Sequence, residues 1–238
     1  LFVHPSSRLI FVVWSKSTVT GYDLVLSRFA GGAWQPFEVV SNGPEDEFDP
    51  QVAFGPDGKI HLVYWTQDAN DGAGVVRYRE APANLGSWSL PQRVSFSDES
   101  ARRPSIAIHQ AMIKVGYEAW PTGSLDPASR DVVIASRELA ANGWMPEWVA
   151  ATGYSGALWT GLHAKGDELW VEWIDAETGP VSGEMAWREL GSDGSWTPIT
   201  LEPFGNEEEY EFRVRENIRW EAQFGPSHPG GNDPPELE

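Results

Sequence analysis

The chain has 238 residues and no cysteine, and its 35 acidic and 17 basic side chains give a net charge of −18. This charge argues against nucleic acid and anionic membranes as partners. The lack of cysteine excludes disulfides and thiolate metal sites, and no apolar run reaches the roughly 18 residues that a membrane-spanning helix needs. Leu1 already belongs to a strand pattern, so we expect a processed or truncated form.

A repeat of about 50 residues organises the chain. Four tryptophans end short apolar runs at spacings of 51, 55 and 53 residues: Trp14, Trp65, Trp120 and Trp173. A second tryptophan follows each of them after 20–24 residues: Trp34, Trp88, Trp144 and Trp196. Strand-like runs between Gly-rich turns at this period are typical of propeller blades. The sequence therefore predicts an all-β fold, a β-propeller of four recognisable four-stranded blades plus a partial fifth unit.

Taken in chain order, the predicted blades cover about residues 1–45, 46–98, 99–152, 153–204 and, for the partial unit, 205–224. The expected strands are 1–3, 9–14, 24–29 and 34–40; 51–54, 60–65, 75–79 and 88–94; 105–109, 113–120, 132–137 and 144–149; 158–163, 168–173, 184–188 and 196–201. In the partial unit, 210–214 and 218–220 resemble the first two strands of a blade. Residues 225–238 are rich in Pro, Gly and acidic side chains, which predicts a flexible tail.

The turn before each fourth strand carries a shared motif: Gly86-Ser-Trp-Ser-Leu-Pro91, Gly194-Ser-Trp-Thr-Pro198, Gly32-Ala-Trp-Gln-Pro36 and Gly143-Trp-Met-Pro146. Together with second strands that end in tryptophan, this pattern resembles the BNR/Asp-box repeats of the sialidase superfamily over about residues 1–202. Ser192-Asp-Gly-Ser-Trp196 is a degenerate, compressed Asp-box. The resemblance implies a structural turn at this box and a propeller fold.

Sialidases use three arginines to hold a carboxylate, a Tyr–Glu nucleophile pair and an Asp acid/base. Arg102-Arg103-Pro104 is similar to the Arg-Ile-Pro of that family, so Arg102 and Arg103 are candidate ligand-binding residues, although they occupy the linker before a first strand. No Tyr–Glu pair can be placed, and we assign no catalytic residue. One arginine recurs in each third strand, which favours a structural role for Arg28, Arg79, Arg137 and Arg188.

Two sets of residues are candidate metal ligands. His4, His109 and His163 align with Gly55 at the end of a first strand, where structural turn histidines are favoured over a ring of metal ligands. Acidic residues gather in loops that share one face of a propeller, and oxygen-rich loops suit Ca²⁺. The candidate calcium ligands are Asp46, Asp49, Asp68 and Asp71, with a solvated acidic face as the alternative.

Positions on the first strands predict a ligand site at the mouth of the central channel. Gln51, Ser105 and Trp159 align two residues before the small residues Ala53, Ala107 and Gly161 and point to the same side of their strands. Trp159, with Tyr154 nearby in sequence, would present an aromatic platform for a sugar ring. The alternative is ordinary packing of Trp159.

These features support three hypotheses. The first is a non-catalytic extracellular or periplasmic propeller that binds a glycan or protein ligand through its acidic loop face. The second is a sialidase-like glycoside hydrolase or lyase, which requires converging carboxylates. The third is a structural subunit that forms homo-oligomers through open strand edges.

Overall fold

The computed structural model describes residues 1–3, 9–19, 21–41, 43–67, 73–82, 84–124, 129–148, 157–175 and 184–203. These residues form four antiparallel sheets and no α-helix, as the all-β prediction requires. The predicted partial unit 205–224 and tail 225–238 lie outside the described residues, as do His4, Asp68, Asp71 and Tyr154. In the part described, no helix is long and apolar enough to cross a membrane.

Each sheet is built from consecutive strands. The first contains β1 (Phe2–Val3), β2 (Ile10–Ser17), β3 (Tyr22–Ala30), β4 (Ala33–Trp34) and β5 (Glu38–Ser41). The second contains β6 (Glu47–Phe54), β7 (Lys59–Gln67), β8 (Gly74–Pro82) and β9 (Gln92–Arg93). The third contains β10 (Glu99–His109), β11 (Met112–Pro121), β12 (Asp131–Glu138) and β13 (Met145–Trp148), and the fourth contains β14 (Ala157–Lys165), β15 (Glu168–Asp175), β16 (Glu184–Glu189) and β17 (Thr200–Pro203). The predicted fourth strand 34–40 is divided between β4 and β5, which both pair with β3.

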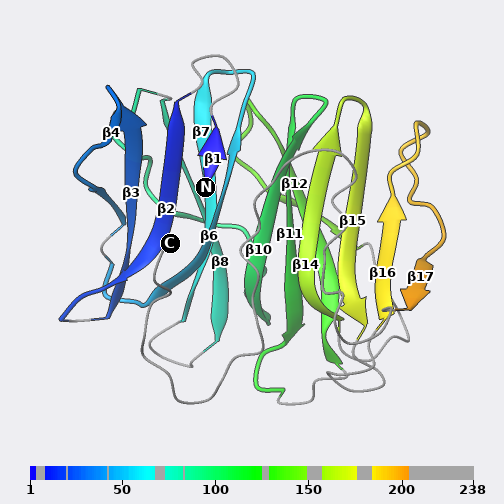
Figure 1. Cartoon of the computed structure of the whole chain (residues 1–238). Helices are drawn as coiled ribbons and strands as arrows, with labels where there is room; N and C mark the ends of the chain where they lie inside the picture. The colour runs from blue at the N-terminus through cyan, green and yellow to red at the C-terminus, as the bar shows by residue number, and fades with distance from the viewer. Residues whose placement is uncertain are drawn as a thin grey trace.

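The four sheets follow one another across the molecule, from the first sheet to the fourth (Figure 1). In the second, third and fourth sheets, the first strand packs against the preceding sheet. β6 contacts β2 and β3, β10 contacts β6 to β8, and β14 contacts β10 to β12. Three apolar clusters lie along these contacts, and they include Leu62, Val115 and Leu162, respectively. Burial between sheets is the main stabilising term in such an arrangement, because one sheet cannot cover its own faces.

The register of the sheets corrects the predicted tryptophan alignment. In the second sheet, Trp65 on the second strand pairs with Phe48, the last residue of the first strand before its register shifts. The second-strand residue at the equivalent position is Glu118 in the third sheet and Ile174 in the fourth. Trp120 and Trp173 therefore do not occupy the Trp65 position. Strand lengths differ between sheets, so similar spacing in the sequence does not preserve register.

The same register corrects two further alignments. Arg79 and Arg188 are equivalent, but Arg137 lies two residues further along its strand. His109 aligns with Gly55 as predicted, whereas His163 occupies the position of Ala107.

Candidate functional site

A β-bulge interrupts the first strand of the second, third and fourth sheets at the same place. The register shifts between Phe48 and Gln51 in β6, between Arg102 and Ser105 in β10, and between Leu158 and Gly161 in β14. Asp49 and Arg103 have φ angles of 48° and 49°, in the left-handed region that non-glycine residues rarely adopt. The first residue of each bulge is thus Asp49, Arg103 or Trp159. Bulges often re-aim side chains next to functional sites.

The structure thereby revises the predicted channel-mouth set. Gln51 and Ser105 are equivalent as predicted, but their partner in the fourth sheet is Gly161, and Trp159 takes the place of Asp49 and Arg103. The bulges of the second and third sheets lie inside strands that begin earlier than predicted. Asp49 and the Arg102-Arg103 pair therefore belong to β6 and β10 and not to linkers.

In the third sheet, the bulge brings two arginines onto one carboxylate. Arg102 Nε lies 3.2 Å from Glu118 Oε2, and Arg103 Nη1 lies 2.9 Å from Glu118 Oε1. The Glu118 side chain is fully buried, whereas those of Arg102 and Arg103 are 26% and 28% exposed. A buried carboxylate needs such partners because isolated burial of a charge is very costly.

A third guanidinium joins this cluster through Trp120. The Cζ atoms of Arg102 and Arg130 lie 5.0 Å and 5.5 Å from the centre of the Trp120 ring, within the range of cation–π attraction. Burial, followed by the nearby charge of Arg102, lowers the pKa of Arg130. We call Arg102, Arg103, Glu118, Trp120 and Arg130 the arginine cluster. The cluster thus brings three guanidiniums together around one indole ring and one buried carboxylate.

Trp120 also borders a hollow of about 350 Å³ at the start of β10, the end of β11 and the start of β12. Its lining consists of Phe96, Asp98, Glu99, Ala119, Trp120, Pro121 and Asp131. The lining therefore combines aromatic and other apolar surface with three carboxylates. Aromatic surface suits the apolar face of a sugar ring, and carboxylate oxygens accept hydrogen bonds from hydroxyls.

Two of these carboxyl groups have perturbed pKa values. Burial raises the pKa of Glu99, although Glu99 Oε1 accepts hydrogen bonds from the Phe96 amide at 2.8 Å and the Tyr117 hydroxyl at 2.9 Å. Burial also raises the pKa of Asp131. Raised carboxyl pKa values in a hollow are a feature of functional sites, although structural burial produces them too.

The other predicted ligand-binding residues have varied surroundings. Ser105 is nearly buried, and its Oγ accepts a hydrogen bond from the Leu162 amide at 3.0 Å, which ties the third sheet to the fourth. Gln51 is half-buried on β6. Trp159 belongs to the bulge of β14, and its side chain lies outside the described part of the structure. Binding through these residues remains a prediction.

Two of the predicted calcium ligands hold local structure. Asp46 Oδ1 accepts a hydrogen bond from the Tyr22 amide at 2.9 Å, and Asp49 Oδ2 accepts one from Trp65 Nε1 at 2.7 Å. Within the described ranges, no three His, Asp or Glu side chains are grouped closely enough to hold a metal ion. Calcium binding that involves Asp68 and Asp71 stays a prediction.

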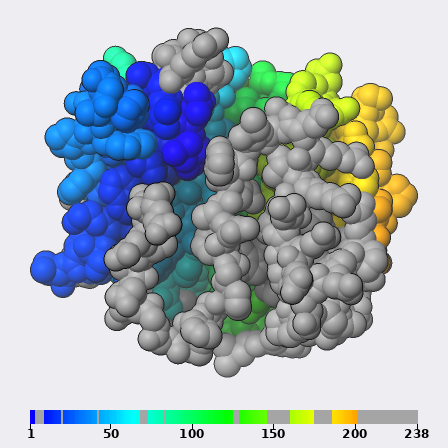
Figure 2. Space-filling model, in the orientation of Figure 1, coloured from blue at the N-terminus to red at the C-terminus, as the bar shows by residue number. Residues whose placement is uncertain are grey.

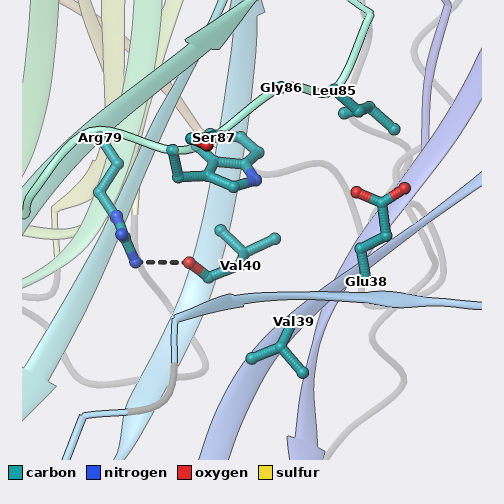
Figure 3. Close-up of a pocket in the computed structure, with 8 residues that line it drawn as sticks. Glu38, Val39, Val40, Arg79, Leu85, Gly86 and Ser87 are labelled. Atoms are coloured by element: carbon teal, nitrogen blue, oxygen red, sulfur yellow. Dashed lines mark hydrogen bonds between the residues drawn. The ribbon is translucent and has the colours of Figure 1, made fainter.

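A second hollow of about 560 Å³ lies between the outer parts of the first two sheets. Figure 3 shows Arg79 directed at the Val40 carbonyl, with Glu38 and Val39 across the opening. Arg79 Nε also donates to the Ser89 carbonyl at 2.7 Å. Its guanidinium is therefore occupied by backbone carbonyls, as is that of Arg188, which donates to the carbonyls of Trp196 and Thr197. These contacts support the structural role predicted for both arginines.

Sequence reasoning missed Glu118, Arg130 and the lining of the Trp120 hollow. One signal was present: Glu118, like Lys114, is a charged residue within the otherwise largely apolar segment from Ile113 to Trp120, and a charged residue in a buried strand needs a partner. The pairing of that glutamate with Arg102 and Arg103 depends on the register between β10 and β11, which the sequence does not state.

Comparison with known proteins places the fold. No family model and no curated protein matches the chain. A thermostable family-43 glycoside hydrolase is 14% identical, with a TM-score of 0.55 over 84% of this chain and 72% of that one. An endo-1,4-beta-xylanase from Bacteroides thetaiotaomicron is 13% identical, with a TM-score of 0.55 over 85% and 75%. A leech intramolecular trans-sialidase is 8% identical, with a TM-score of 0.57 over 82% and 49%.

These neighbours are glycoside hydrolases of the propeller type, so the chain has a sialidase-like propeller fold. At such identities the likeness concerns the fold alone. The expected Asp-box does form a tight turn: Gly191 donates to the Ser195 carbonyl, and Ser195 Oγ and its amide both donate to Asp193 Oδ1. No family model supports BNR repeats in the sequence.

Proposed function

We propose that this protein is a glycan-binding propeller and that it holds an anionic sugar at the third sheet. The observation that carries this proposal is Trp120, which borders the hollow and also lies beneath the guanidiniums of Arg102 and Arg130. A sugar ring packed on Trp120 would place its hydroxyls near the carboxylates of the hollow and an acidic substituent near the arginines. The fold of the neighbours makes a glycan-related ligand plausible.

The charge balance of the cluster favours an acidic ligand. Glu118 accepts from Arg102 and Arg103, whereas no carboxylate of the described residues forms an ion pair with Arg130. A carboxylate or sulfate group on the ligand would supply the missing negative charge, and arginine is suited to bind such groups in a bidentate geometry. An extracellular or periplasmic location, where free polysaccharides occur, accords with this role.

Calorimetric titration with matched oligosaccharides tests the proposal. Uronic acid or sulfated oligomers should bind at least about tenfold more tightly than neutral oligomers of the same length, because a charge-assisted hydrogen bond contributes about 1.5–3 kcal/mol. Trp120→Ala should weaken both ligand classes, and Arg130→Gln should weaken only the acidic class. Trp34→Ala, which removes a half-exposed tryptophan from the first sheet, is the matched control. Equal affinity for acidic and neutral ligands, or binding to proteins alone, would contradict the proposal.

Glycoside hydrolysis is the second candidate function. Glu99 and Asp131 line the same hollow, and burial raises the pKa of both, as a general acid requires. A hydrolase would release reducing ends from a glycan that it binds, and Glu99→Gln or Asp131→Asn would reduce that release at least about 100-fold, the usual size of a general acid–base contribution. Binding without release at any pH from 4 to 8 would favour the non-catalytic function.

A further inference from the structure

The junction of the second and third sheets holds a buried guanidinium against a tryptophan ring. Arg137 is 2% exposed, and its Cζ lies 4.4 Å from the centre of the Tyr78 ring and 5.2 Å from that of the Trp144 ring. Arg137 Nη1 donates to Gln92 Oε1 at 2.8 Å, and Nη2 lies 3.3 Å from Glu80 Oε2. An indole from one sheet and an acceptor from the neighbouring sheet thus hold a guanidinium between them.

The register shows which residue of the second sheet corresponds to Arg137. Arg137 pairs with Ile113, and the residue as far from the bulge in the second sheet is Ile60, which pairs with Ala81. Ala81 shares one face of β8 with Arg79, which contacts the first sheet. The junction of the first and second sheets therefore has an alanine where the next junction has an arginine.

The acceptor is retained at this junction and becomes a carboxylate. Gln35 and Ser89 are equivalent, because each follows a turn tryptophan and donates its amide to a carbonyl of the third strand. Glu38 and Gln92 each lie three residues later and pair with the third strand of their sheet. Glu38 on the first sheet therefore takes the place of Gln92, the residue that accepts from the guanidinium.

The tryptophan is retained as well. Trp88 follows Ala81 by seven residues, as Trp144 follows Arg137, so the two indoles are equivalent. Trp88 and Glu38 both line the second hollow, which has a volume of about 560 Å³. The hollow thus combines the indole and the acceptor that hold Arg137 at the next junction, while the chain itself supplies alanine in place of the arginine.

The charges around the hollow favour a cation beside Glu38. Glu38 is exposed, and among the described residues no Lys or Arg forms an ion pair with it. Arg79 lies across the opening, and its N–H groups donate to the carbonyls of Val40 and Ser89 (Figure 3). A carboxylate binds a guanidinium more strongly than the amide of Gln92 does. The net charge of −18 also attracts cations to the protein.

We propose that the second hollow binds the guanidinium group of a ligand, which packs on the indole of Trp88 and donates to the carboxylate of Glu38. A guanidinium suits this pair because it is planar, stacks on aromatic rings and forms two parallel hydrogen bonds to a carboxylate. Leu85 and Val39, which also line the hollow, offer apolar contact to the alkyl chain that carries the group. The first sheet forms one flank of the described body in Figure 2, whereas the arginine cluster belongs to the third sheet. This site is therefore separate from the proposed glycan site.

Two matched probes test the charge requirement on the full chain at low salt. N-acetylarginine amide carries a guanidinium, and N-acetylcitrulline amide has nearly the same shape without the charge. The arginine compound should shift an indole N–H signal in NMR titration and bind at least about tenfold more tightly than the citrulline compound, because a hydrogen bond between charged groups is lost in the latter. Equal affinity for the two compounds, or no shift at about 20 mM of the arginine compound, overturns the proposal.

A pentapeptide with one central arginine between serines distinguishes two sources of the guanidinium. Binding at least as tight as that of N-acetylarginine amide supports an arginine side chain of a polypeptide as the ligand. Weaker binding of the pentapeptide supports a small guanidinium compound, because the hollow would then exclude a chain on both sides of the arginine.

Variants locate the site. Glu38→Gln should weaken binding of the arginine compound at least about tenfold and leave the citrulline compound unaffected. Glu138→Gln, which removes an exposed glutamate from the third sheet, is the matched control and should bind like the native chain. Val39 is 52% exposed, so Val39→Lys should fold normally and abolish binding by placing an ammonium beside Glu38, whereas Val39→Gln should change affinity little. Urea midpoints verify folding. Equal affinity of Glu38→Gln and Glu138→Gln, or of Val39→Lys and Val39→Gln, overturns the assignment.

Discussion

The second and third sheets have the same bulge within their first strands, but the side chains around it differ. In the second sheet, Asp49 accepts a hydrogen bond from the indole of Trp65, and the Phe48 ring packs on Trp65 with centres 4.9 Å apart. In the third sheet, Arg103 occupies the position of Asp49, and Glu118 occupies that of Trp65. The backbone feature is therefore scaffold, whereas the substitutions on it create a charged cluster. A repeat protein acquires a site by changing residues at a conserved geometric position, without a new fold.

The largest difference between the two sheets should appear on removal of the buried partner. Glu118→Ala leaves Arg102 and Arg103 without their shared carboxylate, and we expect a loss of about 3 kcal/mol in the free energy of unfolding. Urea denaturation at pH 7 measures it. A loss below about 1 kcal/mol would show that solvent compensates both arginines.

Exchange of the bulge residue should affect binding more than folding. Arg103→Asp gives the third sheet the bulge residue of the second and places a carboxylate beside Glu118. We expect a loss of about 1–2 kcal/mol in stability and, if the arginine cluster binds acidic sugars, a loss of affinity of at least about tenfold. Titration of the acidic and neutral oligomers checks this, with Asp49→Arg in the second sheet as the reciprocal variant. Unchanged affinity for the acidic oligomer would remove Arg103 from the site.

Buried glutamates in both sheets should respond to pH in the same direction. Burial raises the pKa of Glu47 and of Glu99 above the ordinary value of 4.5. A carboxyl group whose pKa is higher in the folded than in the unfolded state binds more protons when folded, so stability falls as pH rises from 4.5 through the folded pKa. Glu99→Gln retains an oxygen acceptor for Phe96 and Tyr117. The variant should lack the part of the stability loss at rising pH that ionisation of Glu99 causes.

Urea midpoints of the native chain and Glu99→Gln, measured from pH 4 to pH 8, test this linkage. The urea midpoint of Glu99→Gln should rise relative to that of the native chain as pH rises. Glu47→Gln provides the corresponding variant of the second sheet. A stability difference that stays constant with pH would show that Glu99 has the same pKa in the folded and unfolded states.

The smallest effect is expected at the bulge of the second sheet. Asp49→Ala removes one hydrogen bond to Trp65 at an exposed position, and we expect a loss of about 0.5–1 kcal/mol. Urea denaturation of Asp49→Ala and Glu118→Ala under the same conditions gives the ratio of their two losses in the free energy of unfolding. Equal losses would mean that burial, which distinguishes Glu118 from Asp49, does not set the energetic difference between the two sheets.

Several features of the fold followed from local patterns. The four strand groups and the Asp-box turn at Ser192–Trp196 agree with the sequence analysis, because strand alternation and glycine-rich turns depend on neighbouring residues. The fourth strands agree less well: those predicted at 88–94 and 196–201 are the short strands Gln92–Arg93 and Thr200–Pro203. The structural role of Arg79 and Arg188 was also predicted correctly. The candidate site was only partly predicted: Arg102 and Arg103 were named, but Glu118, Arg130, Asp131 and the double role of Trp120 were not.

The sequence by itself determined that this protein is all-β, repeats about every 50 residues and carries a large negative charge. Composition, periodicity and turn residues are local properties, so they survive without knowledge of register. Only the tertiary structure decided which residues share a position. One extra residue in a bulge moves every later side chain to a new partner. The register between β10 and β11 brings Arg102 and Arg103 to Glu118, and the registers of the three sheets show that the tryptophans of the repeat are not equivalent.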